Sequence, residues 1–229
     1  MGKWIRRGLL ALLALVLGYQ LWIFAHVWWW VEHNPANSAF MAARLDIMQR
    51  NNPDAALRHK WVPYAQISGN LKRALVAAED ARFLAHDGFD WEGIQDAAEK
   101  NLQKGRLVAG GSTISQQLAK NLFLSGSRTP WRKLEEAIIT VMLEQMMSKR
   151  RILEIYMNVI EWGDGVFGAH AAARYYYRTS ASNLSSAQAA RLAAMVPNPR
   201  YYDTHRNARG LQRRTAIIQA RMRSAVVPR

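Results

Sequence analysis

The sequence predicts a mainly α fold, in which one helical domain follows a single N-terminal membrane helix. A nearly unbroken apolar run from Leu9 to Val31 lies close to the start of the chain. From Ile67 onward, apolar residues recur at the three- and four-residue spacing of amphipathic helices. No alternating apolar and polar run is long enough to predict a strand. These patterns together favour a helical domain outside the membrane.

The apolar run at 9–31 has the length of a membrane anchor, because a helix of that length crosses a hydrocarbon core of about 30 Å. Lys3, Arg6 and Arg7 precede the run, and tryptophans occupy 28–30. Basic flanks favour a cytoplasmic N-terminus, and indoles favour the headgroup boundary. A cleaved signal peptide is the alternative, but its apolar stretch is usually roughly 7–15 residues long, and no clear cleavage site follows here. We therefore expect a retained anchor.

The expected division of the chain is a cytoplasmic basic N-terminus at 1–8, a transmembrane anchor at 9–31, a linker at 32–60 and a helical domain at 61–229. The linker is expected because the segment is polar and broken by prolines. In the domain, helices are expected near 91–104, 113–124, 131–147, 149–160, 168–177, 185–196 and 206–222.

The composition narrows the classes of partner and site. Lysine and arginine number 31 against 17 acidic residues, which gives a net charge of +14 and a pI near 10.5. Such a surface attracts a polyanion, and charge alone does not choose among nucleic acid, anionic lipid and a phosphorylated substrate. The chain has no cysteine, which excludes disulfides, thiolate metal sites and a cysteine nucleophile.

The first chemical motif is the stretch from Glu79 to Asp90. At helical spacing, Glu79, Arg82, Phe83 and His86 fall on one face. A carboxylate beside an aromatic ring and two cationic groups suits a general base. The alternative is a salt-bridged helix end that a glycine terminates, which is the commoner role of a lone glutamate near an arginine.

The second motif runs from Gly110 to Asn121. Thr113 and Gln116 match a capping box, and a glycine-rich turn before a helix exposes N–H groups to an anion. The expected polar face consists of Thr113, Gln116, Gln117 and Lys120. Capping an amphipathic helix explains most of this pattern, but it does not require the adjacent glutamines and the lysine.

Two further stretches have stronger structural explanations. Arg132 and Lys133 precede Glu136 by four and three residues, so the three can converge, as ordinary ion pairs on helix surfaces also do. The run from Lys149 to Asn158 fits a buried helix, in which Tyr156 and Asn158 satisfy buried backbone groups.

Together these stretches resemble one family, the lysozyme-like peptidoglycan glycosyltransferases, which also form the N-terminal module of bifunctional penicillin-binding proteins. The strings that carry the resemblance are Glu79-Asp80…Phe83…His86-Asp87-Gly88, Gly110-Gly111-Ser112-Thr113…Gln116-Gln117-Leu118…Lys120-Asn121, Arg132-Lys133…Glu136 and Lys149…Ile152-Leu153-Glu154…Tyr156…Asn158. The resemblance covers about 65–203. No transpeptidase region follows, so we expect the monofunctional biosynthetic form. Three places depart from the family pattern: His170, Tyr177-Arg178 and Arg191.

The resemblance implies a lysozyme-like helical glycosyltransferase domain that adds the disaccharide of lipid II to a growing strand, inverts the anomeric centre and releases undecaprenyl diphosphate. By resemblance, Glu79 is the general base for the acceptor 4-hydroxyl. Glu136 is the second carboxylate, which orients Lys133 and Arg132 or helps to hold a divalent cation. The residues expected to bind substrate are Asp80, Phe83, His86, Ser112, Thr113, Gln116, Gln117, Lys120, Asn121, Arg128, Arg132 and Lys133.

The same resemblance sets the expected surroundings of the enzyme. No cofactor is required by the sequence, a divalent cation is an option, and the metal ligands are unknown. The expected partners are lipid II, the glycan strand and the membrane, without nucleic acid, and proteins of cell-wall synthesis or division are candidates. The expected location is the bacterial inner membrane, single-pass, with a periplasmic catalytic domain.

Two rival functions stay open at this point. A lytic transglycosylase or lysozyme-like hydrolase needs no diphosphate cradle, and a non-enzymatic basic membrane protein needs no paired glutamates.

Overall fold

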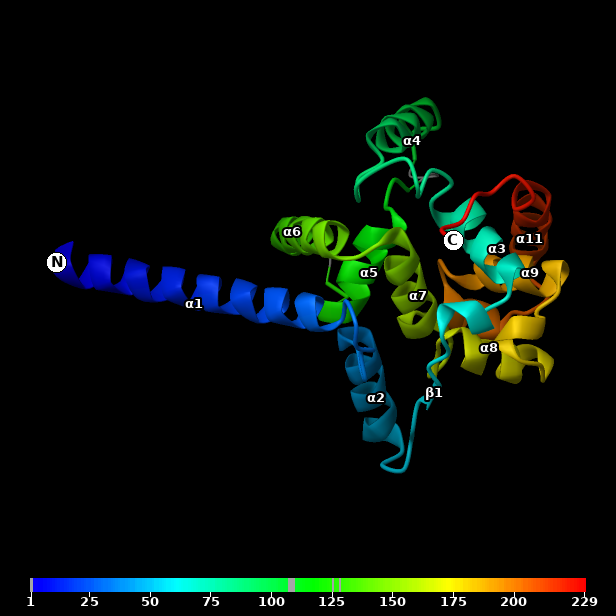
Figure 1. The fold of residues 1–229 in the computed structure, drawn as a ribbon, viewed down its shortest axis with the longest axis horizontal. Coiled ribbons are helices and arrows are strands. Elements are labelled where there is room, and N and C mark those ends of the chain that lie inside the picture. The colour runs from blue at the N-terminus through cyan, green and yellow to red at the C-terminus, as the bar shows by residue number, and fades with distance from the viewer. Residues whose placement is uncertain (1, 107–109, 125, 128) are drawn as a thin grey trace.

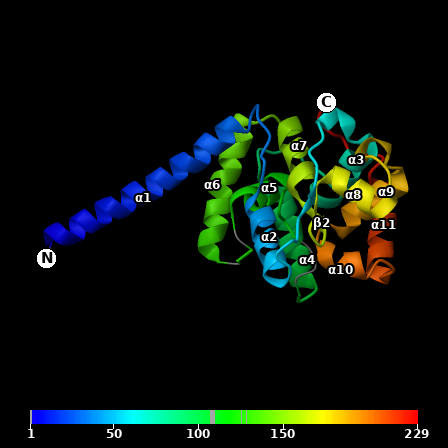
Figure 2. The ribbon, with the colours of Figure 1, turned by 90° about the horizontal axis from the view of Figure 1, so that it is seen from below.

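The computed structural model describes residues 2–106, 110–124, 126–127 and 129–229, and this part of the chain is mainly α-helical. The first helix, α1 (Gly2–Trp29), extends away from the other helices, which gather into one body (Figures 1 and 2). Its mean hydropathy reaches 2.1 over 18 residues, so its length and composition suit a membrane span. The prediction of a mainly α fold behind one apolar N-terminal helix is confirmed.

The helices of the body begin at polar caps that the sequence supplies. Ser38, Ser68, Thr129 and Ser148 each accept a hydrogen bond from the backbone N–H three residues later. The helices in chain order are α2 (Ala39–Asn51), α3 (Gly69–Glu79), α4 (Trp91–Gln103), α5 (Ile114–Phe123), α6 (Pro130–Met146), α7 (Lys149–Val159), α8 (Ala169–Tyr177), α9 (Ser186–Met195), α10 (Pro199–Thr204) and α11 (Arg209–Arg221). Short 3₁₀ turns lie at Tyr64–Gln66 and Ala181–Asn183.

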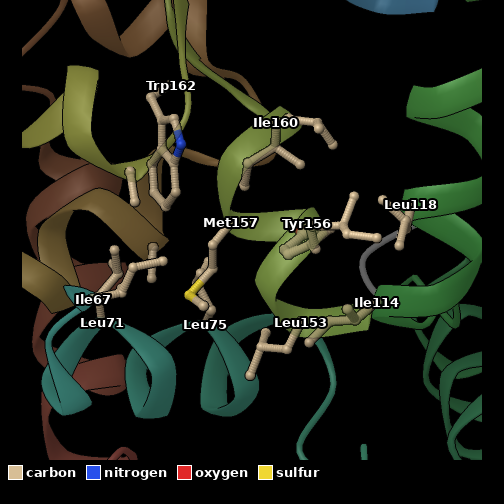
Figure 3. Packing of buried hydrophobic residues seen from close by; sticks show 14 of the residues in the cluster. Ile67, Leu71, Leu75, Ile114, Leu118, Leu153, Tyr156, Met157, Ile160 and Trp162 are labelled. Carbon is tan, nitrogen blue, oxygen red and sulfur yellow. The ribbon is translucent and has the colours of Figure 1, made fainter. Parts of the chain in front are cut away.

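Helix α7 lies at the centre of the hydrophobic core. Figure 3 shows Tyr156 and Met157 of α7 between Leu75 of α3 on one side and Ile114 and Leu118 of α5 on the other. All five side chains are fully buried. Helix α9 packs on both α3 and α11, while α5 packs on α6 and α7. Helix α7 therefore connects the part of the core around α3 and α9 with the part around α5 and α6.

Three details differ from the sequence-based expectations. The segment 32–60, predicted as a linker, contains helix α2, which is capped by Ser38 and packs on α5. A small sheet also forms, in the order β1 (Arg58–His59), β3 (Val166–Phe167), β2 (Glu161–Gly163), with β1 parallel and β2 antiparallel to β3. Its strands are two or three residues long, too short for an alternating pattern to reveal them. The last predicted helix, 206–222, is α11, and α10 before it was not expected.

The side chain of Arg151 holds the segment after α1 against the helical body. The guanidinium of Arg151, in α7, donates to the carbonyl oxygens of Trp30 (3.0 Å) and His33 (2.6 Å). Arg151 also donates to Glu154, whose other oxygen accepts from the N–H of Tyr64 (2.8 Å). One arginine on the central helix therefore fixes where the anchor helix meets the domain.

Candidate active site

Glu79 is the last residue of α3, and its carboxylate is held from two sides. Gln117 Nε2, from α5, donates to Oε2 at 2.9 Å, and Arg214 Nη2, from α11, donates to Oε1 at 3.0 Å. The side chain is 9% exposed. Since a carboxylate has about four lone-pair positions, two of them stay available to a further donor.

Helix α3 ends at Glu79 because Asp80 leaves the helical conformation, with φ −162° and ψ 76°. The carboxylate of buried Asp80 accepts from Ile114 N (3.0 Å), at the start of α5, and from His86 Nε2 (2.9 Å). This one side chain therefore joins the end of α3 to the beginning of α5.

The expectation that residues 79–86 form one helical face is wrong. Residues 81–88 form turns and bends, and Gly88 has φ +94°. Arg82 turns away from Glu79 and pairs with Asp90 and Glu92. His86 bonds to Asp80 rather than to Glu79. The partners of Glu79 therefore come from distant parts of the sequence. The alternative, a salt bridge between Glu79 and a residue nearby in the sequence, is wrong as well.

Phe83 belongs to the hydrophobic core cluster. Its ring is fully buried, and Lys149 Nζ lies 4.7 Å from the ring centroid. This burial favours a structural role for Phe83, although we predicted that it binds substrate.

The capping box at the start of α5 is confirmed. Thr113 Oγ1 accepts from Gln116 N (3.2 Å), and Gln116 Oε1 accepts from Thr113 N (3.0 Å). Thr113 Oγ1 also donates to Gly88 O at 2.7 Å. Both side chains are buried, so they fix the position of the helix start, while neighbouring Ser112 is exposed.

Gln117 stands in the middle of a chain of hydrogen bonds. The hydroxyl of Tyr156, on α7, donates to Gln117 Oε1 at 2.9 Å, so the amide of Gln117 points its nitrogen at Glu79. Burial raises the pKa of Tyr156 well above its usual range, and Glu79 and Asp80 add to the effect. The hydroxyl therefore keeps its proton and remains a donor.

Glu136 is held by its own helix, as its spacing predicts. Arg132 Nη1 donates to Oε2 at 2.8 Å, and Lys133 Nζ pairs with Oε1. Glu136 is buried, whereas half of the Lys133 side chain is exposed. Arg128, another predicted binding residue, lies outside the described residues.

Each partner of the Glu79–Gln117 hydrogen bond lines a pocket. The first, of about 300 Å³, is lined by Glu79, Asp80, Ser112 and Thr113 together with Lys100 and Arg221. The second, of about 370 Å³, is lined by Gln117, Lys120, Asn121 and Arg132 together with Phe40, Glu161 and Arg200. We call these the Glu79 pocket and the Lys120 cleft. The structure thus brings most of the predicted residues to two pockets whose walls are linked by this hydrogen bond.

Burial shifts the pKa values of two charged groups in the Lys120 cleft. Burial lowers the pKa of the Lys120 ammonium, although Glu136 acts in the opposite direction. Burial raises the pKa of Glu161 despite Arg200 at 3.5 Å and Arg44 at 3.8 Å. The cationic groups of the cleft exceed its one carboxylate, so it favours an anionic ligand.

The two predicted carboxylates do not offer a ready metal site. Glu79 is engaged by an amide and a guanidinium, and Glu136 by a guanidinium and an ammonium. Among the described residues, no group of three or more His, Asp or Glu side chains is placed to hold a metal ion.

Four residues of this region are marked by no pattern in the sequence. Arg214 reaches Glu79 from 135 positions away, and no local pattern marks it. Phe40, Glu161 and Arg200 line the cleft from α2, β2 and α10. Tyr156 was expected to satisfy buried backbone groups, and it bonds a side chain instead. Asn158, in contrast, bonds both backbone groups of Val62, as expected.

A family model described as Transglycosylase matches residues 46–223. The chain belongs to the transglycosylase family. This membership confirms the predicted lysozyme-like helical fold and the resemblance that the motifs carried. The family match begins inside α2, within the segment predicted as a linker.

Curated relatives of this transglycosylase match it over nearly its full length. A biosynthetic peptidoglycan transglycosylase of Methylobacillus flagellatus is 72% identical over 222 residues, which are 97% of each chain. Proteins of the same description from Laribacter hongkongensis and Chromobacterium violaceum are 70% and 67% identical. Their matches cover 99% and 96% of each chain, respectively.

The residues of this transglycosylase that are expected to depart from the family pattern lie outside both pockets. Arg178 caps α8 in the left-handed conformation, with φ 53°. Arg191 donates to Arg206 O, and the hydroxyl of Tyr177 is buried without a hydrogen-bond partner in the described part of the chain. His170 is half-buried beside Lys60 and Arg174, and its pKa is lowered, mainly by burial.

Proposed function

We propose that this chain is a peptidoglycan glycosyltransferase that polymerises lipid II into β-1,4 glycan strands, with inversion and release of undecaprenyl diphosphate. The observation that carries this proposal is that Glu79 lines one pocket and accepts a hydrogen bond from Gln117, which lines a second, cationic pocket. A transfer reaction needs one place for the acceptor, one for the donor and a base between them. Family membership and the names of the relatives support the same assignment.

In this proposal the acceptor sugar occupies the Glu79 pocket. Glu79 takes the proton of the 4-hydroxyl as its oxygen attacks the anomeric carbon of the donor. The new bond joins that oxygen to the anomeric carbon, and the bond from the carbon to the diphosphate oxygen breaks. A single displacement of this kind inverts the anomeric centre.

The donor diphosphate occupies the Lys120 cleft. Lys120 and Arg132 line this cleft, where they can stabilise the negative charge that develops on the leaving group. Ser112, Asn121 and Lys133 remain candidate binding residues at the edges. The buried Asp80, Thr113 and Gln116 act by fixing α5, and His86 acts by holding Asp80.

The two glutamates have different roles in this scheme. Both oxygens of Glu136 face cations of its own helix, so Glu136 is suited to aim Arg132 into the cleft. Glu79 has one cationic partner and one neutral partner. We infer that Glu79 is the base and Glu136 is a positioning residue.

The decisive experiment compares lipid II polymerisation by full-length wild type, Glu79→Gln and the control Glu99→Gln, which changes an exposed carboxylate on α4. The product should be polymer that lysozyme digests. Glu79→Gln keeps the shape but accepts no proton, so the rate should fall about 10²–10⁴-fold while the protein stays folded. A near wild-type rate for Glu79→Gln would remove it as the base. Degradation of finished glycan without polymerisation would favour a hydrolase instead.

We propose that α1 anchors the enzyme in the bacterial inner membrane with the domain in the periplasm. The basic residues Lys3, Arg6 and Arg7 support an inward N-terminus. Helix α6 packs on α1 and exposes Trp131, Leu134 and Val141, which suits contact with lipid. A reporter that is active only in the periplasm, fused after Arg229, should be active. Activity of only a cytoplasmic reporter would contradict this orientation.

A further inference from the structure

The Lys120 cleft lies one helical turn from the anchor helix. Lys120 lines the cleft, and Phe123 follows it three residues later on the same side of α5. The ring of Phe123 contacts Trp30 at 5.2 Å and Trp22 edge-on at 6.1 Å, measured between ring centroids. Trp22 belongs to α1, and Trp30 is the first residue after the end of α1. Figure 1 shows the end of α1 beside α5 and the start of α2.

Phe40 adds an apolar surface on the cleft side of Lys120. It is the second residue of α2 and lines the cleft, and its ring lies 5.7 Å from Lys120 Nζ. The ring is half-buried and is not part of the hydrophobic core cluster. Core packing therefore does not account for this ring, which makes a cation–π contact with Lys120.

Aromatic rings therefore lie at both ends of the Lys120–Phe123 turn: Phe40 beside Lys120 at the cleft, and Trp30 and Trp22 against Phe123 at the anchor helix. We call these four side chains the aromatic path: Phe40, Phe123, Trp30 and Trp22. Trp22 is 51% exposed, and Phe40, Phe123 and Trp30 are partly exposed, although Phe123 and Trp30 also pack against the core.

We propose that the aromatic path binds the first isoprene units of the substrate's polyprenyl chain where that chain leaves the diphosphate at Lys120. This inference rests on the proposed function, which places a prenyl diphosphate in the cleft. An apolar chain that passes from the cleft to the bilayer must either meet an apolar surface or expose its methyl groups to water. A ring in the cleft could also stack on a sugar, but only a chain bound for the membrane uses Phe123 and the tryptophans.

The test measures ligand affinity and does not depend on turnover. Farnesyl diphosphate and inorganic diphosphate are titrated into detergent-solubilised full-length protein by calorimetry, and the ratio of their affinities is compared among variants. Both ligands lack sugar, so stacking on a saccharide cannot contribute. The variants are Phe40→Ala, Phe40→Trp and Lys120→Ala. The matched control is Ile47→Ala, which removes an exposed apolar side chain from the same helix away from the cleft.

Phe40→Ala should lower the affinity for farnesyl diphosphate about 10-fold and change the affinity for inorganic diphosphate by no more than about twofold. Burying a phenylalanine ring is worth at least that ratio. Phe40→Trp and Ile47→Ala should keep the wild-type ratio, and Lys120→Ala should weaken both ligands. Equal losses on both ligands in Phe40→Ala would mean that the ring only shields Lys120, and no loss on either would mean that it does not touch the chain. Both results overturn the inference.

Polymerisation by the wild type is measured separately. If the wild type makes polymer while the affinity ratio does not respond to Phe40→Ala, this inference fails and the proposed function stands. If the ratio responds but no polymer forms, the proposed function fails and the prenyl site stands.

Discussion

Tyr156→Phe tests the hydrogen-bond chain that ends on Glu79. The tyrosine hydroxyl donates to Gln117 Oε1, and Gln117 Nε2 donates to Glu79 Oε2, each at 2.9 Å. Because an amide has a donor end and an acceptor end, the hydroxyl decides which end faces the glutamate. Phenylalanine keeps the buried ring and removes only the hydroxyl that orients the Gln117 amide.

The expected magnitudes follow from these contacts. A buried neutral hydrogen bond contributes about 0.5–1.5 kcal/mol, and an unpaired buried oxygen costs about 1–3 kcal/mol. A loss of about 1 kcal/mol lowers Tm by roughly 2–4 °C in a chain of this size. An amide that turns its oxygen toward Glu79 should lower kcat about 10-fold, which corresponds to ~1.4 kcal/mol. KM for lipid II should change little, because Tyr156 is fully buried and cannot touch substrate.

The assay is the initial rate of lipid II polymerisation for Tyr156→Phe, Gln117→Ala and the double variant. If the hydroxyl acts through Gln117, Tyr156→Phe adds no further loss of kcat in the Gln117→Ala background. Tyr64→Phe is the matched control, because it removes a hydroxyl that donates to Pro228 O instead. Additive losses of kcat, or a lower Tm with wild-type kcat, would refute the positioning role of Tyr156.

Three more predictions concern single residues. Arg214→Ala should lower the polymerisation rate about 10-fold or more, because Glu79 loses its charged partner, while Arg209→Ala on the same helix should not. Arg178→Gly should raise Tm in thermal unfolding by roughly 1–3 °C, since relief of about 1–2 kcal/mol of left-handed strain exceeds the entropy cost of glycine. Burial lowers the pKa of Lys120, so Lys120 should lose its proton at a lower pH than an ordinary lysine does. We therefore expect kcat/KM to fall as the pH rises through that lower range. Lys120→Arg should move that loss to higher pH.

Features that depend on neighbouring residues could be predicted from the sequence. The Thr113–Gln116 capping box and the pairing of Glu136 with Arg132 and Lys133 follow from three- and four-residue spacing on a helix. The anchor and most helices of the body follow from apolar runs and periodicity. Such contacts form whenever the local helix forms.

The surroundings of Glu79 could not be predicted in the same way. The helical spacing of 79–86 suggested local partners, but the two bonds that Asp80 makes end the helix there. The real partners, Gln117 and Arg214, come from other helices. Their approach depends on how α3, α5 and α11 pack, and sequence spacing contains no information on that.

Helix α5 explains why the proposed site lies close to the proposed anchor helix α1. Its first turn is fixed by Asp80 and places Gln117 against Glu79, and its last turn carries Lys120 in the cleft and Phe123 against Trp22 and Trp30. At 1.5 Å per residue, Gln117 and Phe123 are about 9 Å apart along the helix axis. A diphosphate whose lipid stays in the bilayer can rise only a short way from the surface. A longer α5 would separate the proposed base from that diphosphate, so the short distance from anchor to base is part of the catalytic design we propose.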